Sequence, residues 1–109
     1  MKIFEVISRV GESGETILGA EDTGSHACYL IYGRMRGRER DRRLKPGKGH
    51  EEMILAVEGD FRFSGEAEGT LTQGQAVHLS GEETLFLENL TDGPAIYLLA
   101  GGHSDSGHH

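Results

Sequence analysis

The 109-residue sequence contains no tryptophan, only two prolines and a single cysteine, Cys28. A lone cysteine cannot form an internal disulfide, which excludes small disulfide-stapled folds and predicts a reducing, cytoplasmic environment. No apolar run approaches the roughly 18 residues that a membrane-spanning helix requires, so we expect no membrane association. The opening residues, MKIFEVISRVGE, are too often interrupted by polar residues for a signal peptide. These absences leave a globular domain whose core rests on valine, isoleucine and leucine.

Positive charge is scarce over most of the chain, because the basic residues are concentrated in one segment. The net charge is −7, yet residues 34–48 hold eight of the eleven lysines and arginines and only two acids. That segment therefore carries +6 and the other residues −13. A nucleic-acid-binding domain spreads basic and aromatic residues over a face, so we do not expect a nucleic-acid partner. The segment is either a surface paired with acids, including across a subunit boundary, or a patch for a small anionic ligand.

Seventeen glycines separate short runs that are rich in β-branched and aromatic residues. Such runs, bounded by glycine, aspartate or asparagine turns, are typical of strands. Nine strands at this spacing predict an all-β barrel, with an immunoglobulin-type sandwich as the alternative. We expect a single domain over residues 1–101 and a histidine-rich tail over residues 102–109. The predicted strands cover residues 2–10, 26–35, 41–46, 52–59, 60–65, 67–73, 76–80, 84–90 and 95–101.

Two spaced patterns lie within these strands. Six residues separate Glu52 from Gly59, and five separate Gly74 from Ser80, with Asn89 closing the second pattern. These spacings resemble the two motifs of the cupin superfamily, and the chain resembles a small single-domain cupin of the cupin-2 type. The resemblance implies a single-domain cupin-type β-barrel, that is, a double-stranded β-helix or jelly roll. It also implies a homodimer, because small cupins usually pair.

The metal-binding positions of those motifs are degenerate. The two histidines of the first motif would fall at Pro46 and Lys48, and the histidine of the second motif at Leu85. Of the four metal ligands that the resemblance implies, only the glutamate, Glu52, is present. His50 lies two residues before it, displaced from the usual position of the family's histidines.

The residues themselves still favour a divalent metal. Residues two apart in a strand share a face, so His50 and Glu52 point the same way. On the predicted strand over residues 26–35, His26 and Cys28 share a face for the same reason. Imidazole nitrogen and carboxylate oxygen together suit Zn, Mn, Fe or Ni. We therefore predict a divalent-metal site drawn from His50, Glu52, His26 and Cys28.

Each of these residues also has a purely structural interpretation. His50 can be a hydrogen-bonded histidine at the barrel mouth. Glu52 can pair with Lys48 or with an arginine of the basic segment, because a buried carboxylate needs such a partner. Cys28 can be a small buried core residue, and His26 a surface residue.

The remaining histidines and two tyrosines receive simpler predictions. His78 is expected to face solvent, because Val77 and Leu79 are the natural inward pair of their strand. Tyr32 and Tyr97 are expected in the wall of the core. The histidines of the tail, which could fold back and bind a metal, are His103, His108 and His109.

Three functions stay open, and the sequence does not decide whether the protein is an enzyme. The leading hypothesis is a metal-dependent barrel, in which the ion polarises a substrate or activates oxygen in the lumen. The second is a metal-free module for a small anionic molecule, and the third is a metal-free isomerase or epimerase with His50 as general base. The ligand-binding residues predicted for the second function are Lys48, Lys45, Arg43 and Tyr32.

Overall fold

The computed structural model describes residues 1–104 and is built almost entirely from β-strands. Neither of the two helical turns in this range is long and apolar enough to cross a membrane. In chain order the elements are η1 (Ile7–Arg9), β1 (Glu15–Leu18), α1 (Ala20–Thr23), β2 (Cys28–Met35), β3 (Arg42–Leu44), β4 (His50–Glu58), β5 (Phe61–Gly65), β6 (Gly69–Leu71), β7 (Ala76–Ser80), β8 (Leu85–Asn89) and β9 (Ala95–His103).

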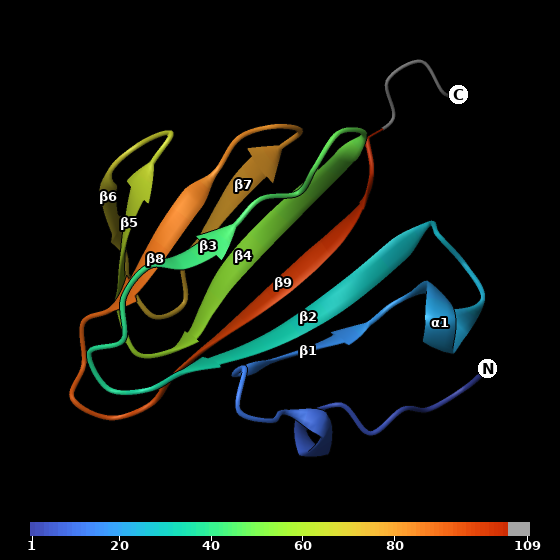
Figure 1. Cartoon of the computed structure of the whole chain (residues 1–109), viewed down its shortest axis with the longest axis horizontal. Coiled ribbons are helices and arrows are strands. Elements are labelled where there is room, and N and C mark those ends of the chain that lie inside the picture. Colours follow the sequence, from blue (N-terminus) through green and yellow to red (C-terminus); the bar gives the residue numbers. More distant parts are fainter. Residues whose placement is uncertain (105–109) are drawn as a thin grey trace.

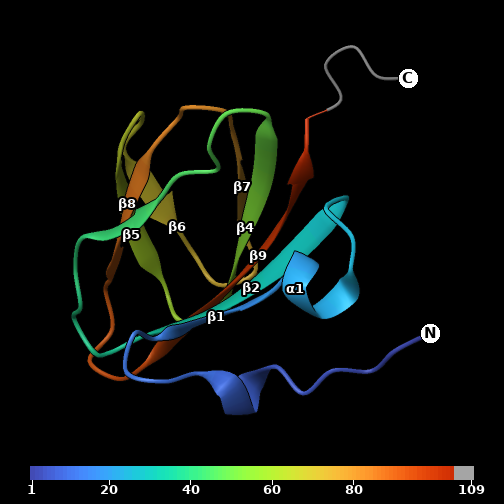
Figure 2. The same ribbon diagram turned by 45° about the vertical axis from the view of Figure 1, so that its right-hand side comes forward.

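Two antiparallel sheets face each other and form the barrel (Figure 1). The larger sheet has the strand order β1-β2-β9-β4-β7, and the smaller sheet has the order β3-β8-β5-β6. The last strand, β9, therefore lies between β2 and β4, which both come much earlier in the chain. Figure 2 shows the smaller sheet as one wall, β4 and β7 as the opposite wall, and β1 and β2 closing the barrel below. The predicted all-β architecture is confirmed.

The core lies between the sheets because alternate residues of each strand turn inward. In β8, Leu85, Leu87 and Asn89 are buried, and the two residues between them are partly exposed. The same alternation runs through β9, whose inward side chains include Tyr97, buried as predicted. The buried apolar residues are Met35, Leu44, Ile54, Ala56, Phe61, Leu71, Leu79, Leu85, Leu87, Ala95, Tyr97 and Leu99.

The strand predicted over residues 2–10 is wrong, whereas the other eight predicted strands each overlap an observed one. No ladder joins this segment to any strand of residues 1–104, and η1 interrupts it. The alternation of apolar and polar residues describes only which side chains share a face. A strand also needs the free edge of another strand to pair with. The edge of β2 is not free, because β1 pairs with it. The segment consequently leaves Ile3 and Ile7 exposed, at 85% and 60% of their surface.

β9 continues to His103, two residues beyond the domain boundary predicted at residue 101. The first part of the predicted tail is therefore the end of a paired strand, opposite the first residue of β4. The division into a barrel domain and a tail stays a prediction. His108 and His109 lie outside the described residues.

Asn89, which closes the second motif, ties the β8–β9 loop to the end of β2. Its amide nitrogen donates to the carbonyls of Arg36 at 2.8 Å and Gly93 at 2.9 Å, and its carbonyl oxygen accepts from the Thr91 amide at 2.8 Å. The side chain is fully buried, so these bonds replace the water that the groups would otherwise bind. The closing asparagine therefore holds the barrel together at the end where β9 begins.

Candidate functional site

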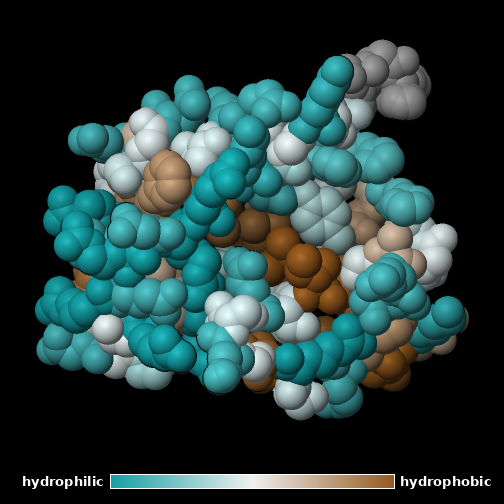
Figure 3. Space-filling model, in the orientation of Figure 1, coloured by the Kyte–Doolittle hydropathy of each residue, from teal (hydrophilic) through white to brown (hydrophobic). Residues whose placement is uncertain are grey.

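The other end of the barrel contains a cavity of about 270 Å³, which we call the mouth cavity. It lies where β2 and β4 begin and β9 ends, beside α1. Ile17 and Ile31 supply apolar surface, and Tyr29, His50 and His103 supply polar rings. In Figure 3, hydrophobic side chains over β2, β9 and β4 are visible in a hollow that hydrophilic residues surround. The barrel interior is thus open to a small molecule from this side.

The structure brings the four predicted metal ligands to this end of the barrel. His50 and Glu52 point inward from β4, as predicted, and His26 and Cys28 line the mouth cavity. Both His26 and Cys28 are exposed. The interpretation of Cys28 as a buried core residue is wrong, because Cys28 is the first residue of β2, at the rim of the mouth cavity, and is exposed there, whereas Tyr29 is the residue that turns inward.

Glu52 is buried, with 6% of its surface exposed, and accepts a hydrogen bond of 2.5 Å from the Tyr29 hydroxyl. Burial raises the pKa of Glu52 above its ordinary value, and the Tyr29 hydrogen bond and the charge of His50 only partly oppose this rise. The nearby Glu15 carboxylate raises the pKa of Glu52 further. Burial and the same hydrogen bond also raise the pKa of Tyr29. The prediction that Glu52 pairs with Lys48 or an arginine is wrong, because the carboxylate of Glu52 accepts its hydrogen bond from the neutral hydroxyl of Tyr29.

Two tyrosines are positioned by glycines on the neighbouring strand. The pairing of β2 with β9 places Tyr29 opposite Gly101 and Tyr97 opposite Gly33. A Cβ atom on Gly101 would lie 2.4 Å from Cζ of Tyr29. A Cβ atom on Gly33 would lie 2.1 Å from Cζ of Tyr97. Each ring therefore lies across its glycine, in space that any other residue would fill.

His50 shares the mouth with a histidine that sequence reasoning assigned to the tail. His50 and His103 are directly opposed in the β4–β9 ladder, and their ring centroids are 5.2 Å apart. The Tyr29 ring lies 5.9 Å from His50, also in an edge-to-face arrangement. Two imidazoles and the Tyr29–Glu52 pair thus gather on the inward side of adjacent strands.

In this arrangement the donors do not form a metal site. Among residues 1–104, no three histidine, cysteine, aspartate or glutamate side chains are grouped closely enough to hold an ion. Tyr29 occupies one carboxylate oxygen of Glu52, and His50 packs against aromatic rings. Zinc sites in proteins use at least three protein ligands. In this arrangement the described residues at the mouth therefore do not fit a divalent metal.

The residues predicted to bind an anion do not line the mouth cavity. Lys45 pairs with Glu82, with Nζ 3.0 Å from a carboxylate oxygen, and Lys48 and Arg43 are exposed. Tyr32 lies on the outer face of the larger sheet, so its predicted place in the core wall is wrong. His78 is exposed as predicted. The basic segment thus forms no cluster at the mouth.

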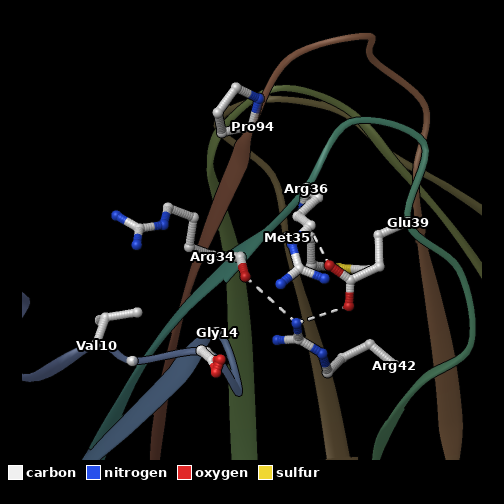
Figure 4. Close-up of a pocket in the computed structure, with 10 residues that line it drawn as sticks. Val10, Gly14, Arg34, Met35, Arg36, Glu39, Arg42 and Pro94 are labelled. Carbon is white, nitrogen blue, oxygen red and sulfur yellow. Dashed lines mark hydrogen bonds and ion pairs between the residues drawn. The ribbon is translucent and has the colours of Figure 1, made fainter.

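A second polar cluster surrounds Arg42 at the end where β9 begins, and sequence reasoning missed it. The guanidinium donates to the Glu39 carboxylate at 2.9 Å and to the Arg34 carbonyl at 3.3 Å (Figure 4). It also donates to the Tyr97 hydroxyl at 3.0 Å, and that hydroxyl donates to the Glu15 carboxylate. The cluster borders a cavity of about 450 Å³.

The charges of this second cluster are paired within it. Burial alone would raise the pKa of Glu39, but the Arg36 amide and the Arg42 guanidinium lower it below its usual value. Burial and the hydrogen bond to Glu15 raise the pKa of Tyr97, against the effect of Arg42. The arginine is therefore committed to its own neighbours, which indicates a structural role.

Solved structures similar to this chain include several cupins. A cupin protein from Bacteroides fragilis matches all of this chain and 92% of its own, with a TM-score of 0.73 and 14% identity. A sugar phosphate isomerase of the cupin superfamily from Silicibacter pomeroyi matches 94% of this chain and 68% of its own, with a TM-score of 0.63 and 16% identity. The Cnp3 cupin domain of Schizosaccharomyces pombe has a TM-score of 0.64 and 7% identity.

The Cnp3 match covers 73% of this chain and 55% of the other, so this chain spans little more than half of that structure. Comparison with protein-family models found no match, and neither did comparison with curated proteins. Identities this low establish the fold alone. The chain therefore has the cupin jelly-roll fold that its two motifs predicted.

Proposed function

We propose that this cupin-fold barrel binds a small, neutral, polar molecule in the mouth cavity. The observation that carries the proposal is the buried Glu52, hydrogen-bonded to Tyr29 at the wall of that cavity. Tyr29 and His50 line the cavity and offer polar contacts, and Ile17 and Ile31 offer apolar surface. Glu52 lies behind Tyr29 and accepts the hydrogen bond of its hydroxyl. A few convergent polar groups in an otherwise apolar hollow are typical of ligand sites.

The charge and size of the mouth cavity favour a neutral ligand over an anion. Its lining includes histidines but no lysine or arginine, and the carboxylates of Glu52 and Glu15 are close enough to influence each other. A cavity of about 270 Å³ lies just below the usual range of roughly 300–1,000 Å³ for ligand pockets, so the molecule is small. Neutral compounds with several hydroxyl groups, from diols to pentoses, have this character.

Removing the Tyr29 hydroxyl is expected to weaken binding of such compounds about tenfold, the effect of one lost hydrogen bond. Binding of diols and pentoses to Tyr29→Phe protein would be measured by amide chemical shifts in NMR titrations. Tyr32→Phe is the matched control, because Tyr32 is on the same strand but faces outward. The proposal fails if these compounds leave the amides of Tyr29, Ile31 and His50 unshifted, or if the two variants bind alike.

A divalent cation is the second candidate, favoured by the position of His103 opposite His50. An ion there would need Glu52 to release Tyr29, so the two candidates predict opposite effects of Tyr29→Phe. The variant would bind the hydroxyl compounds more weakly but Zn²⁺ more tightly. Calorimetric titration with Zn²⁺ measures the second effect. His103→Ala serves as control, because it removes the added imidazole and leaves the Tyr29–Glu52 pair in place.

Glu52→Gln is expected to stabilise the protein at pH 7 by about 1 kcal/mol, because burial of the ionised carboxylate is unfavourable. Folding raises the pKa of Glu52, so the folded state holds this proton more tightly than the unfolded chain. The stability that this gives is complete below the unfolded pKa, about 4.3, and is lost as the pH rises through the folded pKa. The gain should therefore vanish at pH 4.

Thermal unfolding of both proteins between pH 4 and pH 8 checks this expectation. Glu51→Gln is the matched control, because Glu51 faces outward and bonds His78 at 2.9 Å. An equal gain at pH 4 and pH 7 in Glu52→Gln would contradict the raised pKa.

A further inference from the structure

The cavity of about 450 Å³ beside the Arg42 cluster has no part in the binding proposed for the mouth. It lies at the end of the barrel where β9 begins, whereas the mouth cavity lies where β9 ends. β9 is nine residues long, so about 27 Å separates the two ends. We call this second hollow the arginine cavity, because Arg34, Arg36 and Arg42 all line it. Its volume is within the usual range of roughly 300–1,000 Å³ for ligand pockets.

Hydrogen bonds hold the backbone of Arg34 and Arg36 in place at the wall of the arginine cavity. The Arg34 amide donates to the Gly14 carbonyl at 2.7 Å, and the Arg34 carbonyl accepts from the Arg42 guanidinium at 3.3 Å. The Arg36 amide donates to the Glu39 carboxylate at 2.8 Å. Both side chains therefore start from fixed points beside the hollow.

The guanidinium groups of Arg34 and Arg36 have no acidic partner, and both residues are exposed. Neither forms an ion pair with a carboxylate of residues 1–104, whereas Arg42 pairs with Glu39 at 2.9 Å. Figure 4 shows the three arginine side chains around the cavity, with the guanidinium groups of Arg34 and Arg36 well apart. Two unpaired guanidinium groups that border one hollow from different directions are suited to a shared anion.

The charge balance of the arginine cavity also favours an anion. The charged residues that line it are the three arginines, Glu12 and Glu39, and their charges sum to +1, although the whole protein carries −7. Because Arg42 and Glu39 are paired, a ligand meets the charges of Arg34 and Arg36 against one free carboxylate, that of Glu12. The cavity is therefore a positive site on an acidic protein.

We propose that the arginine cavity binds a small molecule that carries a phosphate monoester. A carboxylate presents two oxygens in one plane, and a single guanidinium fork already satisfies it. A phosphate monoester has three free oxygens and a charge of about −1.5 to −2 at pH 7, so it accepts from two forks and balances both charges. Val10, Met35 and Pro94 supply apolar surface for the rest of the molecule.

Arg34→Gln and Arg36→Gln are each expected to weaken the binding of glycerol phosphate about tenfold, because each removes a charge-assisted hydrogen bond. Glu12→Gln is expected to tighten the same binding about threefold, because it removes the free carboxylate of the lining. The amide chemical shifts of Gly11 and Gly14, which line the cavity, measure the affinity in NMR titrations. Both arginines are exposed, so the variants should fold and melt like the wild type.

Arg43→Gln is the matched control for these variants. Arg43 belongs to the same basic segment, but it is exposed on β3 and faces away from the Arg42 cluster, so this variant should bind glycerol phosphate like the wild type. A loss of affinity equal to that of Arg34→Gln and Arg36→Gln would show only an effect of net charge and overturn the proposal. The absence of any shift at Gly11 and Gly14 in the wild type would overturn it as well.

Two other ligands test the chemistry of the bound group. Succinate carries a similar charge on two carboxylates and should bind about tenfold more weakly than glycerol phosphate. Short single-stranded DNA carries phosphodiesters, each with one charge, and should leave the amides of Gly11 and Gly14 unshifted. Succinate that binds as tightly as glycerol phosphate, or DNA that binds more tightly, would overturn the assignment to a phosphate monoester.

The arginine cavity and the mouth cavity are tested independently, because they lie at opposite ends of the barrel. Glycerol phosphate should leave the amides of Tyr29 and His50 unshifted, and Tyr29→Phe should bind it like the wild type. Shifts confined to the mouth would place the phosphate there and overturn the proposal for the arginine cavity.

Discussion

Gly33→Ala is expected to lower the free energy of unfolding by about 3 kcal/mol, because the added methyl group would occupy the space of the Tyr97 ring. The new Cβ atom would lie 2.1 Å from Cζ of Tyr97 and 2.4 Å from both neighbouring ring carbons. The ring cannot turn away, since it is fully buried and its hydroxyl is bonded to Arg42 and Glu15. The midpoint of thermal unfolding should fall by about 15 °C.

Gly93→Ala is the control for Gly33→Ala, because nothing lies within 4 Å of a Cβ atom at Gly93. It should unfold within about 0.5 kcal/mol of the wild type, as surface substitutions usually do. Circular dichroism melts of the three proteins make the comparison. Equal melting of the two variants would show that the Tyr97 ring can leave Gly33, contrary to the packing described.

Arg42→Met is expected to cost about 2 kcal/mol at pH 7, because it removes the hydrogen bonds of the guanidinium to Glu39, Tyr97 and the Arg34 carbonyl, while water can still reach the partly exposed Glu39 carboxylate. The Arg42 side chain is 12% exposed and its nitrogens bond Glu39, Tyr97 and the Arg34 carbonyl. Methionine fills most of the volume of the arginine side chain, so the loss of stability measures the missing hydrogen bonds and charge more than a change in packing. Denaturant titration of both proteins gives the difference in the free energy of unfolding.

The effect of Arg42→Met should shrink in acid. Folding lowers the pKa of Glu39, so its contribution to stability is present above the unfolded pKa and is lost as the pH falls through the folded pKa. Below about pH 4 the difference in stability should be smaller, and what is left should come from the hydrogen bonds to the Tyr97 hydroxyl and the Arg34 carbonyl, which acid does not remove. Arg43→Met is the control, because Arg43 is exposed and faces away from the cluster; its effect should be small at every pH.

The sequence predicted the strands well wherever apolar residues alternate with other residues and glycine turns mark both ends of the run. In β8 the spacing of Leu85, Leu87 and Asn89 marks the inner face, and glycine turns bound most of the other strands. The segment over residues 2–10 failed because its pattern says nothing about the presence of a free edge. In β4, the run from Met53 to Val57 is apolar on both faces, so alternation alone could not say which residues form the core.

The candidate site was predicted only in part, because it depends on how the strands are paired. The inward direction of His50 and Glu52 follows from their spacing and was found. Tyr29 was missed, although its alternation with Ile31 marks it as inward, because its contact with Glu52 depends on β9 lying between β2 and β4. No local pattern reveals that order.

The Arg42 cluster was missed for a different reason. Arg42 and Arg43 are adjacent and equally charged, so the basic segment looked uniform. Arg42 shares a face with Leu44, which is buried, and this spacing was the available signal that one arginine turns inward. The eight basic residues of this segment therefore have at least two different roles: Arg42 is a largely buried structural residue, and others, such as Arg43, are exposed surface charges.

The crossing of each tyrosine ring over a glycine has a consequence for the thermodynamics of ligand binding. A side chain that has one position before the ligand arrives loses little conformational entropy when the ligand binds. Gly101 leaves the space in which the Tyr29 ring lies, and the hydrogen bond to Glu52 fixes the end of the ring there. The wall of the mouth cavity is therefore already ordered before a ligand binds. Binding at the mouth should therefore show a small entropic penalty for ordering, and Tyr29 should keep one rotamer in the free and the bound protein.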